Sequence, residues 1–244
     1  MRFTRAYTDA PLAPGRKVLL DPVASAHLVR VLKLGADAPV VVFNGDGRDY
    51  HGRIAKARKD CVEVELEHVQ EAVEESPLEV TLGQCIARGE KMDWIVQKAT
   101  ELGASAIVPI VSERTEVRLD PERAARRRLH WRGIAIAACE QCGRARVPDV
   151  AEPVELAPWV AAPRDPDELA IAFDPDGQER LRALPAMTRL RLLIGPEGGL
   201  TEREVKLAAA AGFRVVRLGS RVLRTDTAGA AAVAALSALF GDLG

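Results

Sequence analysis

Two strand-like runs that break at glycine, both near the C-terminus, constrain this chain more than any other feature. The apolar run 191–194 continues into Gly195-Pro196-Glu197-Gly198-Gly199, and the run 215–218 continues into Gly219. Each run is typical of a β-strand that ends at glycine and leads into a helical segment. In α/β domains, ligands bind in crevices at the carboxyl ends of strands. The two strand ends are therefore predicted to form two walls of one pocket.

The composition of the 244-residue chain is that of a globular protein, with 48% hydrophobic and 28% charged residues. This balance excludes intrinsic disorder. No apolar run is long enough to span a membrane, and the first residues lack the hydrophobic region of a signal peptide. We therefore expect a soluble cytoplasmic protein with no membrane partner. The net charge of −1 argues against unspecific coating of nucleic acid.

The pattern of predicted elements changes near residue 78. The earlier part is β-rich, with strand-like runs at 18–20, 40–43, 52–54 and 61–66, a turn at 44–47 and one helix at 22–33. The later part alternates strands (78–82, 106–111, 169–173, 190–194, 213–218) with helices (91–102, 121–142, 178–184, 201–211, 226–240). Such alternation predicts a mostly parallel sheet with helices on both faces. We expect a small β-barrel domain at 1–72, a linker at 73–77 and an α/β domain at 78–244.

The loops at the predicted pocket have a plain structural interpretation as well as a functional one. Residues 195–199 could form only a tight turn before a helix that begins with a Thr201–Glu204 capping box. Thr225 or Asp226 can cap the last helix, which is a complete structural role for that segment. Capping does not explain Arg224, a long cationic side chain beside a glycine-rich loop that could face an anion or a base. Neither G-x-G-x-x-G nor a P-loop follows any strand, which disfavours dinucleotide and nucleoside triphosphate enzymes.

Arginine is concentrated in the middle of the chain. The segment from Arg114 to Arg146 contains nine arginines and only four acidic residues. Arginine suits phosphate contacts and base stacking, although a run of charges is also typical of a solvated helix face. In the same region Cys139 and Cys142 have C-x-x-C spacing without a second pair, so we interpret them as small apolar residues of one helix face and expect no metal.

Taken together, these motifs resemble the RsmE family, the uridine-N3 methyltransferases of small-subunit ribosomal RNA. This family is a branch of the SPOUT, trefoil-knotted methyltransferases. The resemblance rests on residues 194–199, 218–219 and 223–228, with further matches at 91–103, 109–114, 140–144 and 147–148 and, near the N-terminus, at 2–3, 27–28 and 31–33. It covers essentially the whole chain in order. The chain departs from the family at Asp226, where Glu is usual, and at Cys142, where Ser is common.

The resemblance implies a PUA-like small β-barrel followed by a SPOUT α/β domain with a deep trefoil knot and a mostly parallel sheet. It also implies a homodimer with the active site at the interface, and 16S rRNA of the small ribosomal subunit as substrate. The implied cofactor is S-adenosylmethionine, bound by three loops. The corresponding residues are Phe173, Ile194, Gly195, Pro196, Glu197, Gly198, Gly199, Leu218, Gly219, Val222, Leu223 and Thr227.

Methylation at uracil N3 requires that the N3 proton leave or that the developing anion be stabilised. Arg224 is our first candidate for stabilising this anion. Glu197 is a candidate base, but an ordinary carboxylate is poorly matched to so weak an acid, and a turn residue bonding local amides explains it equally well. The candidate RNA contacts are Arg2, His27, Arg30, Lys33, Arg114, Arg118, Arg126, Arg127 and Arg128.

Three other functions compete with this prediction. A SPOUT enzyme that methylates ribose 2′-O is the first, and the PUA-like N-terminus and Glu140-Gln141 favour the RsmE branch over it. A noncatalytic RNA-binding protein is the second, and it would be expected to lose the glycines at 195, 198, 199 and 219, which are all present. The third is a small-molecule α/β enzyme, for which the chain has no convergent histidine or carboxylate motif.

Overall fold

The computed structural model describes residues 4–117 and 119–244, so the predicted RNA contacts Arg2 and Arg118 lie outside the described residues. The chain divides into two compact units. Unit 1 takes in the chain up to Glu75 together with Ile136–Val147, and unit 2 contains Ser76–Ala135 and Pro148–Gly244. In the described ranges, no helix combines the length and the apolar character needed to cross a membrane.

Unit 1 is built on a five-stranded sheet in the order β1-β3-β4-β5-β2. Its strands are β1 (Thr4–Tyr7), β2 (Lys17–Leu19), β3 (Pro39–Phe43), β4 (Arg48–Arg58) and β5 (Cys61–Glu71). The predicted turn at 44–47 joins β3 to β4, with Gly45 and Gly47 at positive φ. Alternate side chains such as Val62, Val64 and Leu66 enter the core.

The predicted helix at 22–33 is shorter in the structure. Asp21 caps α1 (Pro22–Ala26), and a π-helical segment, His27–Val31, continues from it. The helix ends before Lys33, which has a φ of +54°. Missing from the sequence prediction is β1, which is too short to show a clear alternation and pairs in parallel with β3.

The segment Ile136–Val147 packs within unit 1 although it is distant in sequence from the sheet. Glu140 accepts a hydrogen bond of 3.0 Å from the backbone N–H of Tyr7 in β1. Cys139 is buried beside Tyr7 and Phe43, and burial raises the pKa of its thiol to about 12. Cys139 therefore behaves as a small apolar side chain in this core.

Unit 2 contains a parallel sheet in the order β11-β13-β10-β12-β6-β7-β8, with β9 also pairing with β7. Its strands are β6 (Glu79–Cys85), β7 (Ala106–Val111), β8 (Asp149–Val150), β9 (Val154–Glu155), β10 (Glu168–Phe173), β11 (Glu179–Arg180), β12 (Arg189–Ile194) and β13 (Arg214–Arg217). Its helices are α2 (Lys91–Glu101), α4 (Leu156–Ala161), α5 (Glu202–Ala210), α6 (Thr225–Phe240) and most of α3 (Pro121–Cys142).

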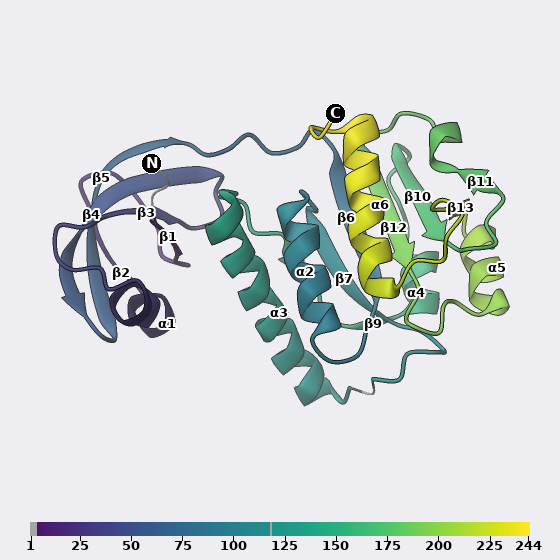
Figure 1. Ribbon diagram of the computed structural model, residues 1–244, viewed down its shortest axis with the longest axis horizontal. Coiled ribbons are helices and arrows are strands. Elements are labelled where there is room, and N and C mark those ends of the chain that lie inside the picture. Colours follow the sequence, from purple (N-terminus) through teal and green to yellow (C-terminus); the bar gives the residue numbers. More distant parts are fainter. Residues whose placement is uncertain (1–3, 118) are drawn as a thin grey trace. The chain divides into compact units, whose positions relative to one another are not determined.

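Helices cover both faces of this sheet (Figure 1). Side chains alternate between the two faces along β6, which shows which helices lie on which face. A Cβ at Gly83 would lie 2.3 Å from the ring of Trp159 in α4, so this position faces α4. Leu82 and Gln84 lie beside Gly229 of α6 and therefore face the other side. The α4 and α5 helices pack together on the first face, and α2 and α6 pack together on the second. The predicted α/β domain with a mostly parallel sheet and helices on both faces is confirmed.

The last helix crosses back over the sheet. The chain leaves β13 near one edge, yet α6 contacts β12, β6 and α2, which lie beyond β10. This return is in line with the knotted fold that the family resemblance implies.

Two local predictions are wrong. Residues 178–184 were predicted as a helix, but they form β11 and a 3-10 turn, Leu181–Ala183, because Glu179 pairs with β13 and binds Arg214. The last helix is not capped by the side chain of Thr225 or Asp226, because Arg224 occupies the N-cap position and makes no side-chain capping bond.

Candidate active site

A cavity of about 530 Å³ lies at the carboxyl ends of β10, β12 and β13. Its walls are residues 173–175, 194–200 and 217–226, with Lys91 and Ala228 completing the lining. The two glycine-interrupted strand ends thus line one cavity, as the sequence predicted. Its position is the crevice in which ligands bind in α/β domains, and its size is that of a small-molecule site.

All predicted cofactor residues except Thr227 line this cavity. Thr227 is exposed on α6 and lies outside the lining. Sequence reasoning missed several lining residues, most of which directly adjoin predicted ones in the chain and could have been found by extending the loops. They are Lys91, Asp174, Pro175, Leu200, Arg217, Ser220, Arg221, Thr225, Asp226 and Ala228.

Glycine is required in the central loop because the backbone folds back on itself there. A Cβ at Gly195 would lie 2.9 Å from the backbone nitrogen of Leu200. Gly199 has a φ of +69°, which side-chain-bearing residues rarely adopt. The loop therefore presents backbone rather than side chains to much of the cavity.

A second loop braces the first from outside the cavity. The guanidinium of Arg114 donates hydrogen bonds to the carbonyl oxygens of Gly198, at 2.7 Å, and Leu200, at 3.4 Å. Nearby, the buried Glu204 forms the predicted capping box with Thr201 and also accepts a 2.8 Å bond from the N–H of Glu113. The loop after β7 thus holds the loop after β12. Arg114, which is also a predicted RNA contact, remains exposed while it makes these bonds.

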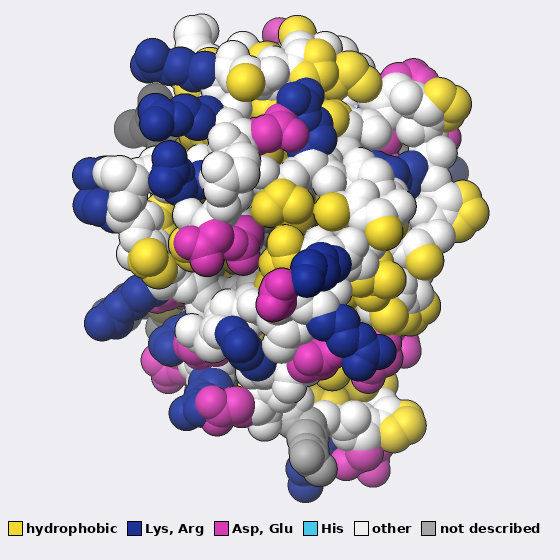
Figure 2. All heavy atoms as spheres, turned by 90° about the vertical axis from the view of Figure 1, so that its right-hand side faces the viewer, with side chains coloured by type: hydrophobic (Ala, Val, Ile, Leu, Met, Phe, Trp, Pro, Cys, Tyr) yellow, Lys and Arg dark blue, Asp and Glu magenta, His cyan; other side chains and the backbone are white. Residues whose placement is uncertain are grey.

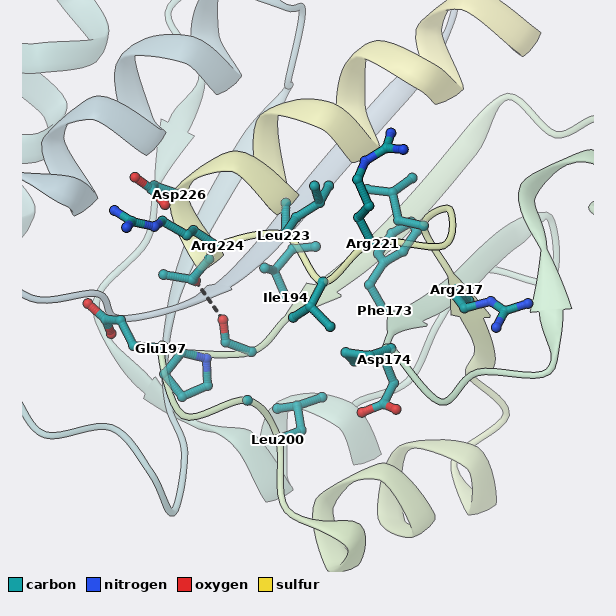
Figure 3. A pocket seen from close by; sticks show the side chains of 18 of the residues that line it. Phe173, Asp174, Ile194, Glu197, Leu200, Arg217, Arg221, Leu223, Arg224 and Asp226 are labelled. Carbon is teal, nitrogen blue, oxygen red and sulfur yellow. Dashed lines mark hydrogen bonds between the residues drawn. The ribbon is translucent and has the colours of Figure 1, made fainter.

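Thr225 connects the last helix to the same loop. Its hydroxyl donates a 2.6 Å hydrogen bond to the carbonyl of Gly195, drawn as a dashed line in Figure 3. The same oxygen accepts a 2.9 Å bond from the amide of Gln84 in β6. Because Thr225 is buried, these bonds fix the start of α6 against β6 and β12.

Glu197 is engaged by neighbouring cations and amides. Its Oε1 accepts bonds from Lys91 Nζ, at 2.8 Å, and from the N–H of Arg88, at 3.1 Å. Partial burial raises the pKa of this carboxyl, but the bonds from Lys91 and Arg88 together outweigh it and leave the pKa below its usual value. A carboxylate so stabilised is a poor proton acceptor.

Charged side chains lie at both ends of the cavity. In Figure 3, Arg224, Asp226 and Glu197 extend toward one end, while Asp174 and Arg217 lie at the other. Arg224 is exposed and lines the cavity without a side-chain capping bond. An electropositive group beside a backbone-lined cavity suits a reaction in which negative charge develops.

The predicted RNA contacts other than Arg114 that the structure describes fall into three groups. His27, Arg30 and Lys33 are exposed on unit 1. Arg126 and Arg127 are exposed on α3, where Arg126 pairs with Glu122 at 3.1 Å. Arg128 differs from them, because its Nε donates a 2.9 Å bond to the carbonyl of Val150.

Comparison with known proteins gives consistent results for both parts of the chain. A family model described as an RNA methyltransferase domain matches residues 74–237, and one described as an RNA methyltransferase PUA domain matches residues 24–67. The ribosomal RNA small subunit methyltransferase E of Buchnera aphidicola from Schizaphis graminum is 32% identical over 99% of this chain and 98% of its own length. The protein of the same name from Bacillus subtilis is 31% identical over 86% of each chain.

Solved structures show the same likeness over the whole fold. A methyltransferase from Legionella pneumophila, in complex with S-adenosylmethionine, superposes with a TM-score of 0.95, 36% identity and full coverage of both chains. The ribosomal RNA small subunit methyltransferase E of Neisseria gonorrhoeae is also bound to S-adenosylmethionine. It superposes with a TM-score of 0.92 and is 34% identical, and the match covers 99% of this chain and 100% of that chain. This chain therefore belongs to the ribosomal RNA small subunit methyltransferase E family.

Proposed function

We propose that this chain transfers a methyl group from S-adenosylmethionine to N3 of a specific uridine in 16S rRNA of the small ribosomal subunit. The observation that carries the proposal is the convergence of three loops, two of them glycine-containing, on one cavity at the carboxyl ends of β10, β12 and β13. Membership of the family and the S-adenosylmethionine bound in two similar structures support it.

The residues of the cavity fit S-adenosylmethionine. The volume of about 530 Å³ suits a molecule of its size. Ile194, Leu218 and Leu223 provide apolar surface for an adenine ring, and the backbone of residues 195–199 provides hydrogen-bonding groups without side chains in the way. The bound molecule would supply an electrophilic methyl group on a sulfonium. The loops exclude water from that group and orient it.

Arg224 acts on the substrate. Its guanidinium lies at the cavity without a structural partner among the described residues, so it is free to stabilise the negative charge that develops on the uracil as N3 loses its proton. Glu197 serves instead to hold the loop, because its carboxylate already accepts bonds from Lys91 and Arg88.

RNA binding is assigned to residues 1–72 and to part of α3. His27, Arg30 and Lys33 on unit 1 and Arg126 and Arg127 on α3 are exposed and suited to phosphate contacts. The target uridine must leave its stack to reach the cavity.

The active form is a homodimer. Hydrophobic side chains are exposed among charged ones on the face of unit 2 drawn in Figure 2. Val222, at the cavity, is 79% exposed. Exposed apolar groups beside a site are typical of an interface that completes it. Light scattering at micromolar concentration would test this, and a monomer would contradict it.

Calorimetric titration with S-adenosylmethionine, with NADH and ATP as controls, tests the first half of the proposal. We expect selective binding at one molecule per chain.

Incubation with small subunits from a strain that lacks the modification, followed by mass spectrometry of the RNA digest, tests the second half. We expect one 3-methyluridine. Binding without methylation, or a 2′-O-methylated product, would contradict the proposed reaction.

A further inference from the structure

The carboxylates that line the cavity differ in what they already bind. Glu197 accepts bonds from Lys91 and Arg88. Asp174 accepts a 2.8 Å bond from the N–H of Asp176, which closes the turn after β10. Asp226, in the first turn of α6, accepts none within the described part of the chain, and its Oδ1 is buried.

An unpartnered buried carboxylate oxygen is costly for a folded protein, because it has lost its water without gaining a donor. The first turn of a helix offsets part of this cost through its dipole, since negative charge is favoured there. That general effect supplies no hydrogen-bond donor to Oδ1. Oδ1 is covered by protein atoms, so the oxygen that a ligand in the cavity can reach is Oδ2, which accepts no hydrogen bond among the described residues. A half-buried carboxylate in this state at a cavity is suited to receive a donor from a ligand.

The position of Asp226 indicates which ligand group this is. Asp226 follows the candidate anion-stabilising residue Arg224 by two positions, and the two side chains extend toward the same end of the cavity in Figure 3. A uracil that places its developing anion near Arg224 has its N3–H in the same region. N3–H is a donor, and Asp226 is the free acceptor.

We propose that Asp226 is the catalytic base that accepts the N3 proton of the target uridine, an inference that rests on the proposed function. As the N3–carbon bond forms and the carbon–sulfur bond breaks, the bonding electrons of the latter go to sulfur, and S-adenosylhomocysteine leaves. The N3 proton passes to a carboxylate oxygen of Asp226 and from there to solvent. Transfer coupled to methylation suits a carboxylate, because bond formation at N3 makes its proton far more acidic.

Asp226→Asn tests the assignment, because it keeps the shape of the side chain and removes its basicity. We expect kcat on small subunits to fall by about 100-fold or more, the usual contribution of general base catalysis. Affinity for S-adenosylmethionine should stay within about twofold of the unmodified protein, since the carboxylate acts on the RNA. Asp226→Glu, which restores the residue usual in the family, should keep most of the activity.

The matched control is Glu202→Gln, which removes another carboxylate from the first turn of a helix, outside the cavity. It should leave kcat unchanged. The pH profile provides a signature that a structural role would not produce. The rate of Asp226→Asn should rise about tenfold per pH unit on the alkaline side, because this variant depends on uracil that has already ionised, while the unmodified protein should show a flatter profile.

A complex with S-adenosylhomocysteine and uridine monophosphate gives a readout that does not depend on turnover. Uracil N3 should lie within hydrogen-bond distance of the Asp226 carboxylate, and a uracil bound elsewhere in the cavity would overturn the assignment. So would an Asp226→Asn variant with normal kcat, or one whose only defect is weak S-adenosylmethionine binding. Failure of the proposed function would look different, because the unmodified protein itself would then produce no 3-methyluridine.

Discussion

The guanidinium of Arg114 donates a 2.7 Å hydrogen bond to the carbonyl oxygen of Gly198, so the loop after β7 holds the loop that lines the cavity. Gly198 contributes no side chain with which to fix this loop. The restraint therefore comes from a residue 84 positions earlier in the chain. A loop that is held before the ligand arrives loses less conformational entropy on binding.

Removing this brace should weaken cofactor binding more than it weakens the fold. For Arg114→Met we expect the S-adenosylmethionine Kd to rise about 5- to 30-fold, which corresponds to about 1–2 kcal/mol for hydrogen bonds from a charged donor at a partly exposed site. Titration calorimetry measures the Kd. The control is Arg203→Met, because Arg203 lies on α5 and its side chain is 88% exposed. An unchanged Kd in Arg114→Met would show that the loop keeps its shape without the brace.

Two glycines of the loop should differ in their tolerance of alanine. A Cβ at Gly195 would approach the backbone of Leu200 to 2.9 Å, whereas a Cβ at Gly198 would approach only the flexible side chain of Arg114, at 3.2 Å. Backbone cannot yield without reshaping the cavity. We expect the Kd for S-adenosylmethionine to rise at least about tenfold in Gly195→Ala and less than about threefold in Gly198→Ala. The reverse order would mean that the loop geometry is misassigned.

Arg224→Ala should separate binding from turnover. The side chain is exposed and makes no capping bond, so stability and S-adenosylmethionine affinity should change little. If the guanidinium stabilises the uracil anion, kcat should fall by about 10²–10³, the usual cost of removing one such group. Single-turnover methylation of small subunits measures this rate, and Arg224→Lys should recover part of it. Normal rates in Arg224→Ala would remove this residue from the mechanism.

Thr225→Val should destabilise the fold through unpaired polar groups. The substitution keeps the size of the side chain but leaves one N–H of the Gln84 amide and the Gly195 carbonyl without the hydroxyl that they bind. The cost should be about 1–3 kcal/mol, as for other buried hydrogen bonds whose partners are left unsatisfied. Urea unfolding measures it, with Thr188→Val on the exposed loop before β12 as control. A Thr225→Val variant as stable as the control would indicate that water replaces the hydroxyl.

Glu197 should make stability depend on acid pH. Its folded-state pKa lies below the ordinary value of 4.5, since Lys91 and Arg88 stabilise the charged form more than burial disfavours it. Its contribution is therefore fully present above about pH 4.5 and is lost as the pH falls through the lower, folded-state pKa. Glu197→Gln should lose less stability than the unmodified protein between about pH 5 and pH 3. Equal losses in denaturant unfolding at these two pH values would contradict the assignment.

Much of this architecture follows from the sequence because it is encoded locally. Apolar periodicity and helix caps predict α2, α3 and α5 to within a residue or two, and the glycine-interrupted strand ends predict which loops line the cavity. The short helix predicted at 178–184 fails because strand pairing with β13 overrides a weak local preference. The bonds of Arg114 to the cavity loop could not be predicted, because an arginine-rich run has the same pattern whether or not its members also contact a neighbouring loop.

The sequence by itself determined the order of elements, the family resemblance and the loops from which the site is made, since these depend on residues close together in the chain. Only the tertiary structure decided how those loops are held and which carboxylate is free. The bonds of Arg114 to Gly198 and of Thr225 to Gln84 join residues 84 and 141 positions apart. The same holds for acceptors. Glu197 accepts a hydrogen bond from Lys91, whereas Oδ1 of Asp226 accepts none. Tertiary packing, and not local sequence, determines which donors reach each oxygen.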